Sequence, residues 1–401
     1  MTAFIVFGRR LESDDPAFAS ALEEAHAQRH RPLCLCNPQG LEMYVSRAAG
    51  QYVLKRMPFT GSLHAPTCRS YDAPPEASGL GQLLGSAIQE DPSGGTTLLR
   101  LAFPVFKTRG HVIDIDDRSD AAKDARAGMR LSLRGLLHYL WDEGELTRWQ
   151  PGFAGRRTWA TVRRHLLGAS AGKFVRGQPL LDRLYVPETF SVEGRDEISA
   201  RRRALWARAS APTEHRRELL IAVAEVKGIS ATRWGASMVV KHVPDQAFWL
   251  DDRMYRQVKR RFESQLSLWA TYEASHLLAI FTFGLQPTGT PAVDEMSLML
   301  VSGHWLPVED DYEIQLVDRL VRDGRQFKKL LRYELDAKLH LSVAILLDTD
   351  PPCALDVSRR EGEEEPAVPP PNHELARWRW IPREGQPPPF PCRRPTPTEL
   401  N

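Results

Sequence analysis

The chain has 401 residues, of which 42% are hydrophobic and 26% are charged, and its formal net charge is only +2. These values are typical of a soluble globular protein with material for two or three domains, and the total charge alone points to no polyanionic partner. No apolar run approaches the roughly 20 residues of a membrane span, and the N-terminus lacks the apolar core of a signal peptide, so we expect a cytoplasmic protein with no membrane partner.

Residues 1–76 predict a small β-rich module. Short runs of β-branched and aromatic residues, separated by Gly, Pro and Asn, indicate strands and turns. The elements expected here are a strand at 3–8, a helix at 16–28, an Asn-Pro-Gln-Gly turn at 37–40, and two strands at 41–47 and 51–56.

Three of the five cysteines lie in this module, in the pattern Cys-x-Cys … His-x3-Cys. Cys34 and Cys36 lie two apart in an extended segment, where alternate side chains point to the same side. His64 and Cys68 lie four apart at a tight turn or helix start, where residues with this spacing share a face. The intervening hairpin would bring both pairs around one tetrahedral Zn²⁺, and four protein ligands leave no open position, so the zinc would be structural.

The cysteine count supports this interpretation. An odd number of cysteines in a cytoplasmic chain argues against a disulfide framework and for metal ligands or free thiols. The alternative is that the cysteines are free and partly buried and that His64 lies at the surface. His30 is a spare ligand in case His64 points away from the cysteines.

Residues 77–190 predict a helical segment with a basic bias. Amphipathic helices at 130–143 and 158–168, followed by a hairpin at 173–186, have the order of a winged helix-turn-helix. Eight cations face one acid between positions 148 and 183, and such a footprint is what phosphate contacts require. A solvated basic face is the alternative. The residues expected to contact nucleic acid, with DNA as the expected form, are Arg156, Arg157, Arg163, Arg164, Lys173 and Arg176.

Residues 191–360 predict an α/β domain with a mixed sheet. Its apolar runs alternate with amphipathic helices. Strands are expected at 218–226, 236–243, 276–284, 295–301 and 341–348, and helices at 251–273 and 310–323.

Three residues in this domain suggest a weak catalytic alternative. Glu225 and Lys227 end an apolar strand as Glu-x-Lys, which resembles the pattern of restriction-endonuclease-like nucleases, where the acid holds a metal and the lysine positions water. Asp348 ends another strand and could supply the second carboxylate. Mg²⁺ would then be the cofactor. The motif is incomplete, because no Asp-bearing strand lies just upstream of Glu225, and solvent-facing charges at strand ends are the alternative.

Residues 361–401 begin with an acidic run and continue with many prolines. This composition predicts a mostly disordered tail. Trp378 and Trp380 are the residues in it that could dock on the body of the protein.

The segments PLCLCNPQGLEMYV, SLHAPTCRSYDAP, SLRGLLHYLW, AEVKG and ILLDTDPP together resemble a bacterial family of about 400 residues. That family is a domain of unknown function found mostly on plasmids and integrative conjugative elements. The resemblance covers the chain up to the Pro-rich tail, and its most specific part is the CxC … HxxxC stretch. It implies a cytoplasmic accessory protein of a mobile element, and it carries over no catalytic residues.

The sequence therefore predicts an α+β, multidomain protein with a zinc-finger-like module, a winged-helix-like basic segment, an α/β domain and a disordered tail. The expected function is that of a zinc-binding, nucleic-acid-associated accessory protein without defined catalysis, which has protein partners of the mobile element. A metal-dependent nuclease, either active or degenerate, is one alternative. A protein-interaction module without nucleic acid is the other.

Overall fold

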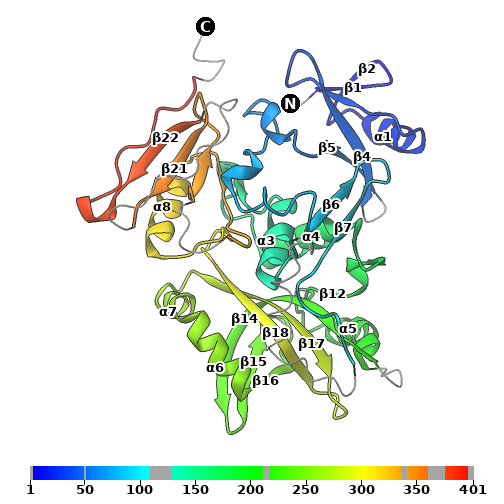
Figure 1. Cartoon of the computed structure of the whole chain (residues 1–401), viewed down its shortest axis with the longest axis vertical. Helices are drawn as coiled ribbons and strands as arrows, with labels where there is room; N and C mark the ends of the chain where they lie inside the picture. The colour runs from blue at the N-terminus through cyan, green and yellow to red at the C-terminus, as the bar shows by residue number, and fades with distance from the viewer. Residues whose placement is uncertain are drawn as a thin grey trace.

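The computed structural model describes residues 3–48, 51–108, 129–210, 216–335, 341–359 and 375–395. Over these ranges the protein is a mixed α/β molecule with seven α-helices and several sheets. A barrel-like sheet forms the lower half in Figure 1, the N-terminal and C-terminal sheets lie above it, and helix α3 (Leu133–Glu143) lies between them. None of the helices in the described ranges is long and apolar enough to cross a bilayer.

The N-terminal sheet is antiparallel throughout. Its strand order is β2 (Arg9–Glu12), β1 (Ala3–Val6), β3 (Leu33–Cys34), β4 (Leu41–Ala48) and β5 (Gln51–Arg56). Helix α1 (Phe18–Ala27) packs on β4 and β5 and buries Leu22 and Ala25. The helix begins two residues later than predicted, because the Asp15 carboxylate accepts the N–H of Ala17 and fixes a turn there.

Helix α3 is the centre of the molecule. Ser132 caps it by accepting the N–H of Gly135, and eight of its eleven residues are buried. It packs against α4 (Trp159–Ser170) on one side and against the barrel strands on another. A helix buried on almost every side belongs to a core. The two helices and their order are as predicted, and a winged helix built on them stays a prediction.

The hairpin predicted at 173–186, which would be the wing of a winged helix, is part of a larger sheet. This sheet has the order β11 (Gln178–Pro179), β10 (Lys173–Val175), β7 (Thr96–Leu99) and β6 (Ile88–Asp91). β10 pairs with β11 around a turn, but its other edge pairs in parallel with β7. A strand with both edges paired cannot move as a free wing. β8 (Phe106–Thr108) pairs separately with β13 (Arg216–Glu218).

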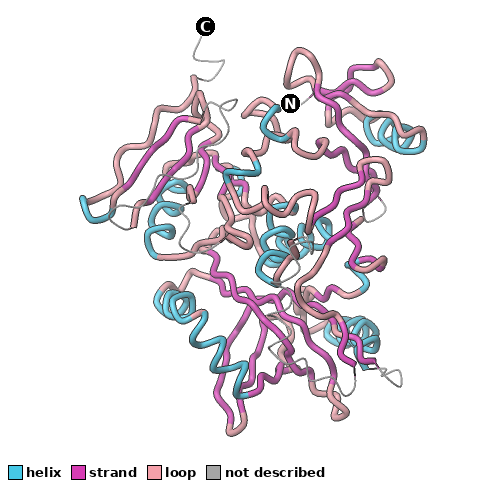
Figure 2. The backbone as a smooth tube through the Cα atoms, in the orientation of Figure 1, coloured by secondary structure: helices cyan, strands magenta, loops and turns pink. Residues whose placement is uncertain are grey.

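The barrel-like sheet is built around one long strand. The strands are β12 (Leu184–Tyr185), β14 (Leu220–Thr232), β15 (Gly235–Val240), β16 (Ala247–Asp251), β18 (Pro291–Val301) and β17 (His276–Leu285). β14 pairs with β17 along its first half and with β15 along its second half, so the pairings close into a ring. Figure 2 shows these strands together in the lower half of the molecule, and β14, β17 and β18 are the longest strands in the described ranges.

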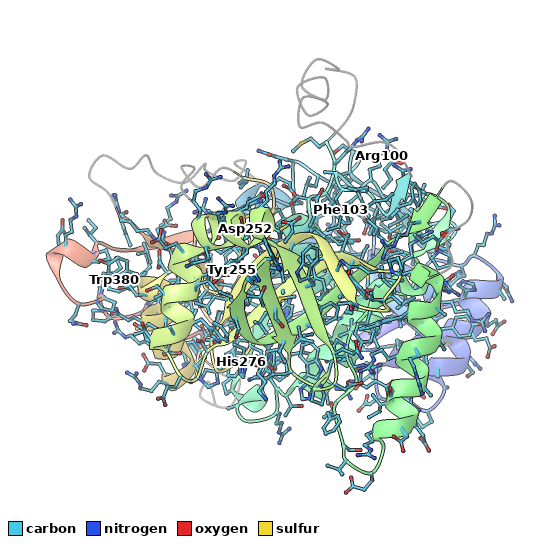
Figure 3. The ribbon with its side chains drawn as sticks, turned by 90° about the horizontal axis from the view of Figure 1, so that it is seen from below. Arg100, Phe103, Asp252, Tyr255, His276 and Trp380 are labelled. Carbon is cyan, nitrogen blue, oxygen red and sulfur yellow. The ribbon has the colours of Figure 1, made fainter. Side chains whose placement is uncertain are left out.

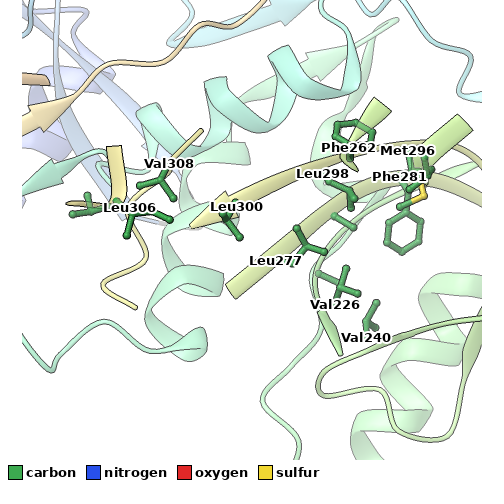
Figure 4. Packing of buried hydrophobic residues seen from close by; sticks show 14 of the residues in the cluster. Val226, Val240, Phe262, Leu277, Phe281, Met296, Leu298, Leu300, Leu306 and Val308 are labelled. Carbon is green, nitrogen blue, oxygen red and sulfur yellow. The ribbon is translucent and has the colours of Figure 1, made fainter. Parts of the chain in front are cut away.

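The largest hydrophobic cluster of the described residues packs on these strands and continues into the C-terminal sheet as far as Trp378 and Trp380; part of it appears in Figure 4. Phe281 and Leu298 come from neighbouring strands, and Phe262 enters from the helical side. The predicted helix 251–273 is two helices, α6 (Asp252–Arg261) and α7 (Glu263–Thr271), since Phe262 leaves helical geometry where its ring is buried. The remaining helices are α5 (Arg195–Ser210) and α8 (Asp311–Arg322).

The C-terminal sheet corrects the prediction of a disordered tail. Its order is β22 (Ala376–Trp380), β21 (Cys353–Val357), β20 (Ala344–Leu346), β19 (Phe327–Lys329) and β9 (Arg148–Trp149). β22 pairs in parallel with β21, and Trp378 and Trp380 are buried, so residues 375–395 are an ordered part of the body. The two tryptophans dock as the sequence suggested. The rest of the predicted tail lies outside the described residues.

Candidate metal centre

The predicted ligands come from two neighbouring loops of the N-terminal sheet. Cys34 ends β3, which is held between β1 and β4, and Cys36 follows two residues later. His64 directly follows the short 3₁₀ helix Gly61–Leu63, and Cys68 lies in the turn after it, where its N–H donates to the carbonyl of Ala65. Segments about 30 residues apart in the sequence thus meet at one point.

The four ligand atoms lie within 4.8 Å of one another. The Sγ atoms of Cys34 and Cys68 are 3.8 Å apart, and Nδ1 of His64 lies 3.2 Å from Sγ of Cys36 and 3.8 Å from Sγ of Cys68. A tetrahedral zinc with Zn–S of about 2.3 Å and Zn–N of about 2.0–2.1 Å has S–S edges of roughly 3.8 Å and S–N edges of roughly 3.5 Å. The spacing is that of a zinc tetrahedron and is far too long for a disulfide.

Burial and protonation also fit a metal. Cys34, His64 and Cys68 are at most 3% exposed, so water cannot compete for these positions. The pKa of the Cys68 thiol is lowered to about 3, chiefly because Cys34 hydrogen-bonds to its sulfur and also because His64 and the Ser70 N–H do so. The pKa of Cys34 is raised by the same hydrogen bond and by burial. A lowered thiol pKa fits a zinc ligand, because the thiolate is the form that binds zinc.

His30, the spare ligand, is used elsewhere. Its Nε2 accepts the N–H of Phe7 at 3.1 Å, and its ring stacks on the Phe7 ring with centroids 4.2 Å apart. His64 occupies the ligand position instead. The four side chains fit a closed site, in which zinc would cross-link the two loops and perform no chemistry of its own.

A buried ion-pair network connects the loop 61–72 to the rest of the protein. This loop carries His64 and Cys68, and we call it the metal loop. The N–H of Asp72 donates to the carbonyl of Gly61, which closes the loop 61–72. The Asp72 carboxylate then pairs with Arg56 at 2.5 Å and with Lys328 of β19. Lys328 also pairs with Asp142 of α3 at 2.8 Å. We call Arg56, Asp72, Asp142 and Lys328 the Asp72 network.

Gly61 is required for this closure. A Cβ at position 61 would lie 2.6 Å from Cβ of Asp72, which is too close for two carbon atoms. The loop therefore depends on the absence of a side chain at one end and on the charge of Asp72 at the other.

A cleft of about 1070 Å³ opens between the N-terminal sheet and the helices α3 and α4. Phe18, Tyr52 and Phe59 line it from the N-terminal side, and Arg69 lies on it one residue after the ligand Cys68. Arg163 and Arg164 line it from α4. The metal loop is thus part of one wall of this cleft, and α4 is part of the other.

The structure separates the six predicted nucleic-acid contacts into two groups. Lys173 is 1% exposed, and its amine pairs with Glu143 at 2.8 Å, so the prediction that it contacts nucleic acid is wrong. Arg157 is half-buried and its guanidinium is engaged within the protein: it donates to the carbonyls of Leu146 and Arg148 and stacks over Trp149.

The other four predicted cations stay accessible. Arg156, Arg164 and Arg176 are exposed, and Arg163 is half-buried with its Nε donating to the carbonyl of Val186. Arg163 and Arg164 reach the cleft, whereas Arg176 stacks over Phe106 in another part of the molecule.

The weak catalytic candidates do not form a joint site among the described contacts. Glu225 is 2% exposed, and its Oε1 accepts from Lys241 and from Nδ1 of His276, both at 2.6 Å. Lys227 lies at a register shift between Val226 and Gly228 and faces solvent.

Asp348 lies in the bend after β20 (Ala344–Leu346) of the C-terminal sheet, whereas Glu225 lies in the barrel strand β14. Its carboxylate forms a two-pronged pair with Arg325, with both distances 2.8 Å. A carboxylate held in this way is occupied by a cation of the protein itself.

The sequence patterns missed the true partners of Glu225. Lys241 follows the neighbouring strand β15, and His276 begins β17, where its ring stacks on Trp305 with centroids 4.0 Å apart. Burial alone would raise the pKa of Glu225, but the hydrogen bonds from His276 and Lys241 hold that pKa below its usual value. Only the strand register reveals these partners. The described contacts therefore identify Glu225 as the carboxylate that orients His276.

A family model described as a protein of unknown function (DUF1173) matches residues 4–383, which is nearly the whole chain. No curated protein and no solved structure gives a significant match.

Proposed function

The chain belongs to the DUF1173 family, and we propose that it is a zinc-containing, nucleic-acid-associated protein whose metal site holds one wall of a binding cleft. The observation that carries this proposal is the position of Arg69 next to the ligand Cys68, on the same cleft as Arg163 and Arg164. The resemblance to plasmid and conjugative-element proteins adds an accessory role, in the cytoplasm, on a mobile element.

The charge pattern of the cleft supports a phosphate-bearing ligand. Most charged side chains around it are paired with one another, as Lys55 is with Glu143 and Arg56 is with Asp72. Arg69 and Arg164 form no ion pair within the described part of the chain. Unpaired cations on opposite walls are the groups that would meet the phosphates of a bound strand and release its counterions.

The size and the lining of the cleft favour a polymer over a small molecule. Its volume of about 1070 Å³ exceeds the roughly 300–1,000 Å³ of most small-molecule sites. Phe59 is 59% exposed beside Tyr52, and exposed aromatic rings are the groups on which bases of single strands stack. These features favour nucleic acid over a purely protein-binding role.

Reversal of two cleft charges tests the proposal. In the variant Arg69→Glu/Arg164→Glu we expect the affinity for a fluorescent single-stranded oligonucleotide to fall at least about tenfold. The salt slope, which is the steepness with which the logarithm of the binding constant falls with the logarithm of the salt concentration, should be lower by about 1.4, because two phosphate contacts are lost. Fluorescence anisotropy across a series of salt concentrations measures both.

The matched control is Arg9→Glu/Arg10→Glu, which reverses two exposed arginines of β2, at the opposite edge of the sheet from β5. This variant should bind with the affinity of the wild-type protein, apart from a small general charge effect. Equal losses in both variants would overturn the cleft as the binding site, and no binding by the wild-type protein would favour the protein-interaction alternative.

A further inference from the structure

A second basic surface lies at the other end of the molecule, on helix α6 and the neighbouring hairpin. Five cations of this ten-residue helix are exposed, against two acids at its start. The cations are Arg253, Arg256, Lys259, Arg260 and Arg261. The whole chain has a net charge of only +2, so this helix is a strong local concentration of positive charge.

The cations lie along the outward side of the helix. Arg253, Arg256 and Arg260 follow the spacing i, i+3, i+7, which forms one stripe on an α-helix. The opposite side, with Met254 and Val258, packs on the barrel. Figure 3 shows Asp252 and Tyr255 on α6 at the surface of the barrel. Only Arg256 forms an ion pair on this helix in the described part of the chain, with Asp252, so the stripe keeps unpaired positive charge.

An exposed tryptophan stands beside the start of this helix. β14 and β15 are joined by Arg233 and Trp234, and the Trp234 side chain is 70% exposed, the highest value among the large hydrophobic residues described. The guanidinium of Arg233 lies 4.8 Å above the Trp234 ring. An apolar ring of this size in water is unfavourable, which favours a role in binding a partner.

The strand register places the hairpin tip and the helix side by side. Gly235 pairs with Asp251, and Asp251 caps α6 by accepting the N–H of Met254 at 2.7 Å. A Cβ at position 235 would lie 2.1 Å from the carbonyl oxygen of Leu250, so only glycine lets the hairpin tip approach the helix start this closely.

We propose that α6 and the Arg233–Trp234 tip form a contact surface for single-stranded nucleic acid, in which the helix cations meet phosphates and Trp234 stacks on a base. This inference rests on the proposed function and adds a second site to it. A ring next to a row of cations is the combination by which single strands are bound without sequence preference. An anionic membrane would use the charges as well, but it would not use one ring at the tip of a rigid hairpin to recognise bases.

The test separates stacking from charge in the full-length protein. Binding of a fluorescent oligothymidylate is measured by anisotropy for Trp234→Ala and for Arg253→Glu/Arg256→Glu/Arg260→Glu. We expect Trp234→Ala to weaken binding roughly five- to a hundredfold with the salt slope unchanged, because stacking releases no counterions. The triple variant should lower the salt slope by about 2. Trp234→Phe should recover most of the affinity, since it keeps a stacking ring.

The matched control is Arg195→Glu/Arg203→Glu, two exposed arginines on α5. If the cleft variant loses affinity but both α6 variants bind like this control, the α6 surface is overturned while the proposed function stands. If the wild-type protein binds no oligonucleotide, both fall. Sedimentation with phosphatidylserine vesicles distinguishes nucleic acid from a membrane as the partner of the α6 surface. Binding to vesicles without binding to oligonucleotides would overturn the proposal in favour of a membrane.

Discussion

Replacement of Cys68 by serine is expected to remove zinc from the protein and to unfold the loop 61–72. Sγ of Cys68 lies 3.8 Å from both Sγ of Cys34 and Nδ1 of His64, and these contacts lower the pKa of its thiol. A serine hydroxyl does not ionise near neutral pH and is a poor zinc ligand. Structural zinc contributes on the order of 10 kcal/mol in small zinc-binding peptides, so even part of that loss would be large for this protein.

Metal analysis after gel filtration, together with thermal unfolding, measures this effect. Zinc content should fall from about one per chain to nearly none, and the N-terminal sheet should lose its cooperative unfolding. Cys353→Ser is the matched control, because Cys353 is a buried free cysteine in β21, away from the cluster. It should lose some stability and keep its zinc. A Cys68→Ser protein that retains a full equivalent of zinc would rule out this ligand set.

Replacement of Lys328 by methionine is expected to destabilise the protein by about 3–5 kcal/mol, because it leaves two buried carboxylates without their shared cation. Lys328 is 9% exposed and pairs with both Asp72 and Asp142. Burial alone would lower the pKa of Lys328, yet the two carboxylates raise that pKa to about 12, so the lysine is charged in the folded protein. Methionine keeps a similar unbranched apolar stem, one heavy atom shorter, and removes the charged amine.

Urea unfolding of the wild-type protein and of Lys328→Met at neutral pH checks this prediction. The control is Lys227→Met, an exposed lysine in β14, which should change the free energy of unfolding by less than about 0.5 kcal/mol. A loss below about 1 kcal/mol for Lys328→Met would mean that water or local rearrangement solvates Asp72 and Asp142. Because Asp72 closes the metal loop, Lys328→Met should also make zinc easier to remove with a chelator.

The sequence predicted that the three cysteines and His64 form one cluster, because the pattern that joins them is local. Cys34 and Cys36 share a side of an extended segment, His64 and Cys68 share a turn, and one hairpin joins the two pairs. Most helices and strands were also predicted close to their bounds, since apolar periodicity determines them. The Asp72 network could not be predicted in this way, because Asp72 and Lys328 are 256 residues apart in the sequence.

The errors share one physical cause, which is long-range packing. Lys173 appears in a basic run, but the sheet places its amine in the core against Glu143. Lys227 appears beside Glu225, but a register shift turns it outward, and Lys241, which directly follows β15, pairs with Glu225 instead. The tail has a composition typical of disorder, yet two tryptophans supply enough burial to add a strand to the C-terminal sheet.

The basic stripe on α6 was overlooked for a different reason. The sequence segment around it also contains apolar residues, and only the structure separates the side that packs on the barrel from the side that carries Arg253, Arg256 and Arg260. The exposure of Trp234 could not be predicted either, because tryptophan is highly buried on average and only the fold shows that this ring has nothing to pack under.

The central claim is that Cys34, Cys36, His64 and Cys68 bind one zinc ion. X-ray absorption at the zinc K-edge of the purified wild-type protein tests it most directly. If these four residues bind zinc, the spectrum should show one zinc per chain with three sulfur neighbours at about 2.3 Å and one nitrogen neighbour at about 2.0–2.1 Å. Protein purified without chelator that contains no zinc, or zinc surrounded only by oxygen and nitrogen, would contradict it.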